Sequence, residues 1–166
     1  LYLGSGLCLL LVKAVQGLGR ASGKKEAKIR GTDFAWLAGA TLAGGVAAPI
    51  ILLFSLRATP AATASLLLNF ESVATALIAA VVFREAVSRK AWWAVGLITA
   101  ASMVLSLDFG ANWGISVGSL GILAACFFWG IDNNLTRNIS EKDPITIVII
   151  KSMAAGTFSL VVALLI

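Results

Sequence analysis

The chemistry that this chain could perform depends on a few polar side chains that interrupt long apolar stretches. Glu71 is the most informative of them, because it lies close to the middle of the apolar stretch from Ala61 to Phe83. Polar and ionisable groups in hydrocarbon surroundings are costly and usually serve a function. The other candidates of this kind are Asn69, Asp132, Asn133 and Lys151.

On a helix, Glu71 would share its face mainly with apolar side chains, among them Ala64, Leu67 and Ile78. Apolar surroundings disfavour the charged form of a carboxyl group. This property suits a proton relay or a cation site. The alternative is a protonated Glu71 that only makes a hydrogen bond to a neighbouring helix.

The remaining candidate residues would either line a path through the protein or form contacts between its helices. Asn69 would share a face with Ser65 and Ser72, which favours close helix packing, although this face could also line a cavity. Asp132 and Lys151 would reach a similar depth if their helices are antiparallel neighbours, and an ion pair between them could form a gate. Alternatively, Lys151 extends toward the membrane surface and Asp132 is solvated or caps a helix.

Several other kinds of site are excluded by the composition. The sequence has no His, and its two Cys residues, Cys8 and Cys126, are isolated and fall in apolar segments. It also lacks a Gly-rich phosphate loop of the Walker type and a Gly-x-Ser-x-Gly motif. We therefore expect no enzyme, no metal site and no cofactor.

The elements that carry these residues are expected to be membrane-spanning helices. The chain is 59% hydrophobic and 13% charged, with a mean hydropathy of +0.95. About 20 helical residues cross a bilayer, and the runs are apolar on every side rather than alternating as in a barrel strand. The predicted fold is an all-α polytopic transmembrane helix bundle. The predicted spans are Phe34 to Leu56, Ala61 to Phe83, Ala91 to Leu107, Ile115 to Ile131 and Ile145 to Ile166.

The basic residues predict the orientation of these spans. Nearly all of the 13 Lys and Arg residues fall on alternate connectors, whereas Arg57 stands alone on the opposite side. The positive-inside rule makes the basic loops cytoplasmic. A basic loop beside anionic lipid explains the net charge of +5 without a nucleic-acid partner.

Three local features add to this picture. Leu1 to Val12 is apolar but spans only about 18 Å, too short to cross, and predicts the tail of a truncated helix in an internal fragment of a longer protein. Pro49 is expected to kink its span. Small residues predict close helix contacts at Gly39, Ala43, Gly44, Gly45 and Ala48, and again at Gly114, Gly118, Gly121 and Ala125.

A stretch from Ala58 through Pro60 and Asn69 to Glu71 continues to Val82-Phe-Arg-Glu85 and the helix around Gly96. In this stretch the sequence resembles EamA-type members of the drug/metabolite transporter superfamily. In that family a short external turn opens a helix with a polar position at mid-membrane. The family often has Glu before Pro where this chain has Glu71 before Ser72.

The resemblance implies helices two to seven of a ten-helix protein built from two inverted five-helix repeats. Residues 1–107 would be most of the first repeat, and residues 115–166 would be the start of the second. It implies a secondary transporter that exports small metabolites or drug-like compounds by alternating access. Glu71, Asn69, Asp132, Asn133 and Lys151 would form the substrate or proton path.

The expected location is a cell inner membrane or plasma membrane. The expected partners are the lipid bilayer and a small-molecule substrate, and a homodimer is kept as an alternative assembly. A second hypothesis is a non-transporting membrane scaffold or partner subunit, in which the polar groups only hold helices together. A membrane enzyme acting on lipid-linked substrates would need catalytic residues outside this sequence.

Overall fold

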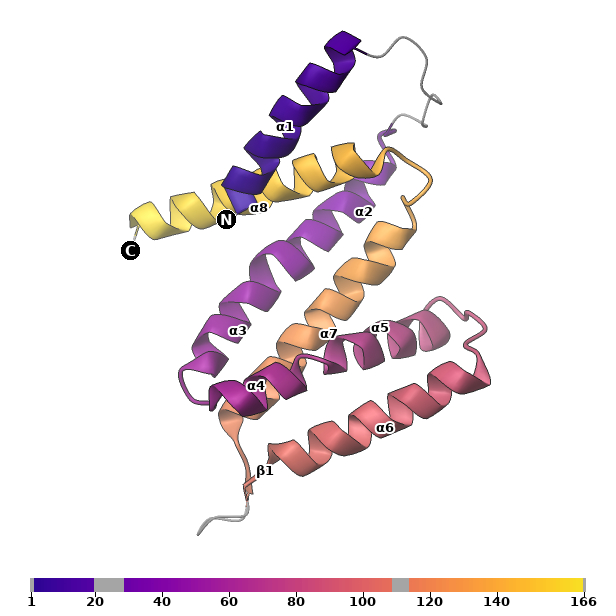
Figure 1. Ribbon diagram of the computed structural model, residues 1–166, viewed down its shortest axis with the longest axis vertical. Helices are drawn as coiled ribbons and strands as arrows, with labels where there is room; N and C mark the ends of the chain where they lie inside the picture. Colours follow the sequence, from indigo (N-terminus) through magenta and orange to yellow (C-terminus); the bar gives the residue numbers. More distant parts are fainter. Residues whose placement is uncertain (1, 20–28, 109–113, 166) are drawn as a thin grey trace. The chain divides into compact units, whose positions relative to one another are not determined.

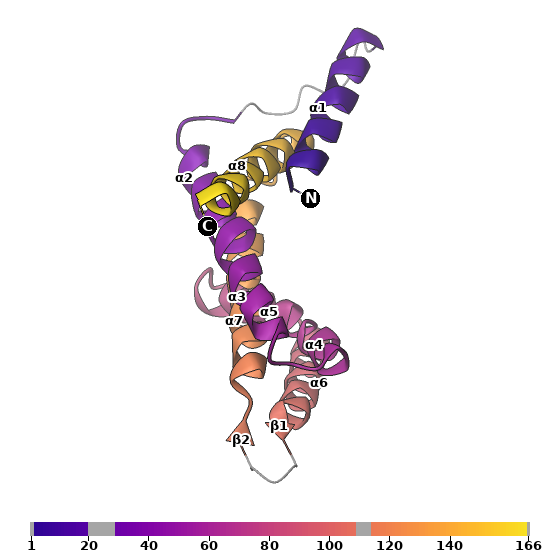
Figure 2. The same ribbon diagram turned by 90° about the vertical axis from the view of Figure 1, so that its left-hand side faces the viewer.

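The structure, a computed structural model, describes residues 2–19, 29–108 and 114–165 (Figure 1). These residues are almost entirely helical, which confirms the all-α prediction. Besides turns and connecting segments, they contain a two-residue antiparallel pair, β1 (Leu107–Asp108) with β2 (Gly114–Ile115) (Figure 2). The chain forms two compact units: unit 1 contains Leu1–Val46 and Leu135–Ile166, and unit 2 contains Ala47–Asn134.

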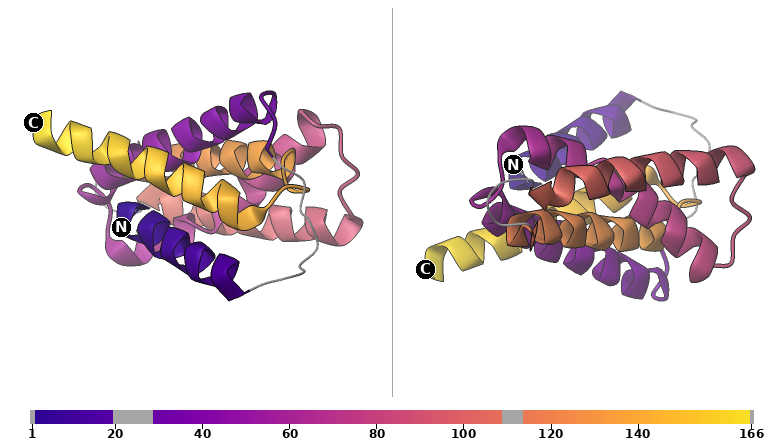
Figure 3. Two further views of the ribbon diagram at one scale, coloured as in Figure 1. Left: turned by 90° about the horizontal axis from the view of Figure 1, so that it is seen from above. Right: turned by 90° about the horizontal axis from the view of Figure 1, so that it is seen from below.

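Unit 1 is built on an antiparallel pair of helices, α1 (Tyr2–Gly19) and α8 (Pro144–Leu165), which lie side by side in Figure 3. The helix α2 (Asp33–Ala40) also packs on α8. Helix α1 is longer than the apolar run to Val12 that the sequence predicts, because it continues to Gly19 and so spans about 27 Å.

Helices α1 and α8 approach so closely that their contact leaves little room for a side chain in place of Gly156 or Gly6. A Cβ atom added to Gly156 of α8 would lie 2.6 Å from the backbone nitrogen of Leu3. A Cβ atom on Gly6 would lie 3.0 Å from Sδ of Met153. Small residues allow membrane helices to approach in this way, so that dispersion contacts can form along their backbones.

Charged side chains join the helices of unit 1 at the start of α8. Lys13 of α1 forms an ion pair with Asp143. The Asp143 carboxylate also accepts hydrogen bonds from the Thr146 hydroxyl and, at 2.9 Å, from the Ile145 amide, so it caps α8. Lys142 lies 3.6 Å from Asp33 at the start of α2. The apolar residues Leu37, Ile139 and Ile147 form a buried cluster.

A π-helix, η1 (Thr41–Ala47), follows α2 within the span where a kink is predicted. Proline lacks an amide hydrogen and crowds the carbonyl four residues before it, so the turn before Pro49 cannot keep regular α-helical hydrogen bonds. Wide turns of this type occur frequently at functional sites. The small residues expected at a close contact are partly confirmed here, since a Cβ atom on Gly45 would lie 2.8 Å from that of Ala155.

Unit 2 is built from five helices and a small apolar core. Helix α6 packs against both α4 and α5. The main buried cluster of unit 2 is formed by Ala64, Leu67, Ile122 and Cys126. The helices are α3 (Ala48–Leu56), α4 (Ala61–Leu67), α5 (Phe70–Val81), α6 (Arg89–Ser106) and α7 (Val117–Arg137), which extends past the unit boundary.

The start of α7 fits tightly against the end of α3. A Cβ atom on Gly118 would lie 3.0 Å from the carbonyl oxygens of Ser55 and Ala58, and one on Gly121 would lie 2.0 Å from Oγ of Ser55. These contacts confirm the prediction that Gly118 and Gly121 belong to a close helix contact. The side chains at 105–115 lie outside the described part, so the prediction for Gly114 is untested.

Within the described residues, three helical stretches are long and apolar enough to cross a membrane. They are Asp33–Leu56, Ala61–Val81 and Pro144–Leu165. Helices α6 and α7 cover most of the two other predicted spans. Their ends are more polar, because α6 begins at Arg89 and the last two turns of α7 contain Asp132, Asn133 and Asn134.

Candidate functional site

The polar residues of unit 2 meet where α5 packs beside α7. Glu71 lies in the first turn of α5. Nδ2 of Asn133 on α7 donates a hydrogen bond to Oε1 of Glu71 at 2.9 Å and another to Oγ1 of Thr75 at 3.2 Å. We call Glu71, Thr75 and Asn133 the acid–amide cluster. The structure thus brings two of the predicted path residues into direct contact.

Asn134 joins α5 and α7 beside the acid–amide cluster. Its Nδ2 donates to the backbone carbonyl of Thr75 at 3.0 Å and to that of Gly130 at 2.8 Å. The Asn134 side chain is buried. A Cβ atom on Gly130 would lie 3.0 Å from the backbone of Ala74, so glycine is needed for this approach. Sequence reasoning missed these contacts, although an Asn four residues after a Gly on one helix face was a usable signal.

The apolar span that carries Glu71 is broken into two helices, whereas the sequence predicts one. The interruption, at Leu68 and Asn69, is visible between α4 and α5 in Figure 1. The amide of Asn69 bonds to the carbonyl of Leu66 at 3.2 Å, and that of Glu71 bonds to the carbonyl of Leu68 at 3.1 Å. Both bonds reach three residues back instead of four, which is the tighter 3₁₀ pattern. We call this interruption the α4–α5 break.

Asn69 lies in the break and does not join the acid–amide cluster. Its side chain is exposed, and its Nδ2 donates to the carbonyl of Leu66 at 3.0 Å and to that of Ser65 at 3.5 Å. The face that it was predicted to share with Ser65 and Ser72 is an exposed face of unit 2.

The two other predicted path residues lie in different units. Asp132 belongs to the part of α7 in unit 2, and Lys151 belongs to α8 in unit 1. Within unit 1, Nζ of Lys151 donates to Oγ1 of Thr136 at 3.0 Å. The ion pair between Asp132 and Lys151 therefore stays a prediction.

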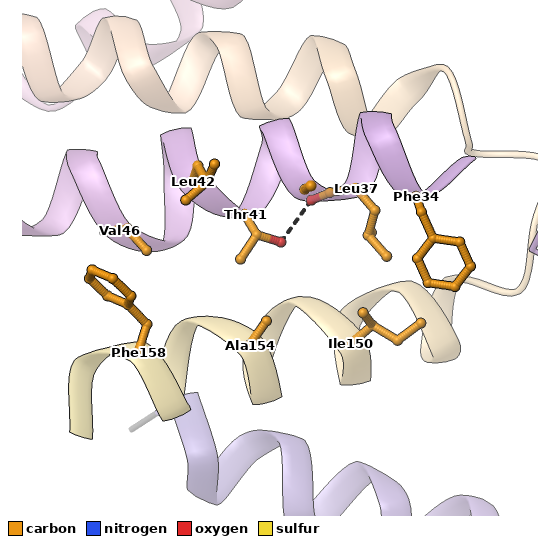
Figure 4. Close-up of a pocket in the computed structure, with 9 residues that line it drawn as sticks. Phe34, Leu37, Thr41, Leu42, Val46, Ile150, Ala154 and Phe158 are labelled. Carbon is orange, nitrogen blue, oxygen red and sulfur yellow. Dashed lines mark hydrogen bonds between the residues drawn. The ribbon is translucent and has the colours of Figure 1, made fainter. Parts of the chain in front are cut away.

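Unit 1 contains a cavity of about 350 Å³ between α2, η1 and α8 (Figure 4). Its lining is apolar apart from Thr41, whose hydroxyl donates to the carbonyl of Leu37 at 2.8 Å. With no ionisable side chain in its lining, this cavity suits an apolar group rather than an ion. The lining residues are Phe34, Leu37, Ala38, Thr41, Leu42, Val46, Ile150, Ala154 and Phe158.

The described residues give little support to a metal site or to thiol chemistry. No three His, Cys, Asp or Glu side chains among them gather where they could hold a metal ion. The two thiols are free; Cys126 is buried and Cys8 is exposed. The acid–amide cluster is thus the strongest candidate site.

Comparison with known proteins places the chain in a family. The sequence pattern of the EamA-like transporter family matches residues 2–107. The chain belongs to this family. It is also 33% identical, over 149 residues, to a protein of Methanothermobacter thermautotrophicus described as an uncharacterized transporter. The match covers 86% of this chain but only 43% of that relative, and no solved structure matches the chain.

Family membership confirms the resemblance seen in the sequence. An EamA-like chain with membrane-spanning helices is a multi-pass membrane protein, and its family is a family of transporters. The division into repeats at 1–107 and 115–166 stays a prediction.

Proposed function

We propose that the intact EamA-like protein is a secondary transporter that exports small metabolites or drug-like compounds by alternating access, with Glu71 as its coupling residue. The observation that carries this proposal is the hydrogen bond between Glu71 and Asn133 beside an interrupted apolar span. Transporter binding sites are commonly formed by interrupted helices whose ends face the ligand or coupling ion.

The geometry around Glu71 supports a coupling role. Its Oε1 accepts a hydrogen bond from the amide of Asn133, and it lies in the first turn of α5, within an apolar span of membrane-crossing length. A carboxyl group in such a position would exchange a proton, or a proton for a cationic substrate, during transport.

The other parts of the proposal follow from family and charge pattern. The ten-helix inverted repeat, with this chain as helices two to seven, would place the site between two halves. Asp132 and Lys151 would gate the cytoplasmic mouth, and the basic loops would face the cytoplasm of an inner or plasma membrane. A homodimer is compatible with this arrangement.

The test is the Glu71→Gln variant of the intact protein, reconstituted in vesicles and assayed with a panel of small organic compounds under imposed pH gradients. Glutamine keeps an acceptor for Asn133 but cannot release a proton. We expect pH-dependent transport to be lost and membrane insertion to be kept. The control is Ser72→Ala, which changes the neighbouring exposed residue and should transport normally.

Two results would contradict the proposal. Unchanged pH-dependent transport by Glu71→Gln would exclude Glu71 as the coupling residue. No transport by the unmodified protein with any compound, together with lower stability or assembly of Glu71→Gln, would favour the scaffold or partner-subunit hypothesis.

A further inference from the structure

The α4–α5 break removes the expected amide partner from two backbone carbonyls. Because the amides of Asn69 and Glu71 bond three residues back, the carbonyls of Ser65 and Leu67 do not receive the bonds that a continuous α-helix would give them. Both carbonyls lie within an apolar span of membrane-crossing length. Unpaired backbone carbonyls are costly there, since no water can bond to them.

Two side chains take the place of the missing amides. Nδ2 of Asn69 reaches the carbonyl of Ser65 at 3.5 Å, in addition to its shorter bond to Leu66. Sγ of Cys126, on α7, lies 3.7 Å from the carbonyl oxygens of both Leu67 and Leu68. Of these two, Leu68 already accepts the amide of Glu71. The Cys126 side chain is fully buried in the core of unit 2, so this thiol has a fixed position.

No proline explains the interruption, since the nearest one, Pro60, precedes α4. Asn is the residue at the break whose side chain competes with the backbone for hydrogen bonds. A continuous helix through Asn69 would rotate α5 relative to α4, because each residue of helix advances the face by about 100°. Glu71 would then leave Asn133.

We propose that Asn69 and Cys126 are positioning residues for Glu71. By bonding to the freed carbonyls they maintain the α4–α5 break, which lets α5 begin anew at Phe70 and turns Glu71 toward Asn133. This inference rests on the proposed function and deepens it. Asn69 acts through the backbone and not by touching the transported solute.

The first test measures the position of Glu71 directly. In the intact protein, Glu71 and Asn133 are each replaced by cysteine, and every native cysteine is replaced by serine. The Cys126→Ser change keeps a hydrogen-bond donor at that position, because serine carries a hydroxyl group. A short bifunctional thiol reagent should cross-link the two positions. We expect Asn69→Leu to lower the cross-linking yield several-fold. Asn69→Ser, whose hydroxyl bonds backbone carbonyls, should retain it.

The matched control is Ser65→Ala, which removes a hydroxyl bonded at 2.8 Å to the carbonyl of Ala62, one turn before the break. It should cross-link like the parent. If Asn69→Leu does not yield folded protein by gel filtration, Asn69→Ala removes the same amide. Full cross-linking in the variants without the amide would overturn the inference and leave the proposed function standing.

The second test is transport by Asn69→Leu in the protein that keeps Glu71, Asn133 and Cys126. We expect the midpoint of its pH profile to shift, with Asn69→Ser and Ser65→Ala close to the parent. A loss of general stability would lower the rate without moving that midpoint. If cross-linking falls but the pH profile is unchanged, Asn69 positions Glu71 but Glu71 is not the coupling residue, so the proposed function fails while the positioning role of Asn69 stands.

Discussion

Asp143 shows at the scale of one residue how charge and helix capping combine in this protein. Partial burial disfavours its ionised form, but hydrogen bonds from Lys13 and Thr146 outweigh this effect and hold the pKa of the Asp143 carboxyl well below its usual range. A group with a lowered pKa in the folded state stabilises the fold fully above its unfolded pKa of about 3.9. That contribution is lost as the pH falls below this value.

The Asp143→Asn variant separates these two roles, because Asn is also a good helix cap. We expect it to keep α8 intact and to lose the ion pair with Lys13. The Lys13 side chain is 45% exposed, so the loss at neutral pH should be small, below about 1 kcal/mol. Thermal unfolding in detergent should show that the difference from the parent narrows as the pH falls below about 4 or as salt rises.

A matched control is Asp143→Ala, which also removes the cap and should cost more stability than Asp143→Asn at every pH. Equal stability of Asp143→Asn and the parent at neutral pH and low salt would show that the ion pair contributes nothing.

At the scale of the element, the contact between α3 and α7 depends on the absence of a side chain at Gly118. A Cβ atom there would lie 3.0 Å from two backbone carbonyl oxygens of the α3 end, which cannot move as freely as side chains. We expect Gly118→Ala to destabilise the protein by about 1–3 kcal/mol, the usual cost of overpacking. The measurement is the unfolding midpoint in detergent.

The matched control is Gly96→Ala on α6, where an added Cβ atom would meet no atom within 4 Å. Replacing a helical glycine without a clash should raise stability by up to about 1 kcal/mol. If both variants shift the unfolding midpoint equally, α3 and α7 do not depend on a close backbone approach at Gly118.

The elements themselves were largely predictable, because long apolar runs and short charged connectors follow from bilayer thickness. The α4–α5 break was not, since Leu68, Asn69 and Phe70 carry no Pro or Gly that would mark it. It depends on a thiol of α7, Cys126, far away in the sequence. In the candidate site, Glu71 and Asn133 stood out as polar groups in apolar stretches, whereas Thr75 and Asn134 did not, because their roles come from α5 and α7 meeting.

At the scale of the whole molecule, the basic loops predict which connectors face the cytoplasm. Single cysteines at Ala58 and Ser140, both exposed, test this prediction in an otherwise cysteine-free protein. In sealed cells, an impermeant maleimide should label Ala58→Cys from outside and should label Ser140→Cys only after the membrane is opened. The reverse pattern would invert the proposed orientation.

The ion pair between Lys13 and Asp143 joins residues 130 positions apart in the chain. Ribosomes add about 5–20 residues per second, so α1 is made about 7 to 26 s before the start of α8 emerges. During that interval the face of α1 around Gly6 cannot make its contacts with Ser152 and Met153 of α8. Biogenesis of this protein therefore includes a waiting period, in which slowed translation or a shortened C-terminal part would leave α1 unassembled and open to membrane quality-control proteases.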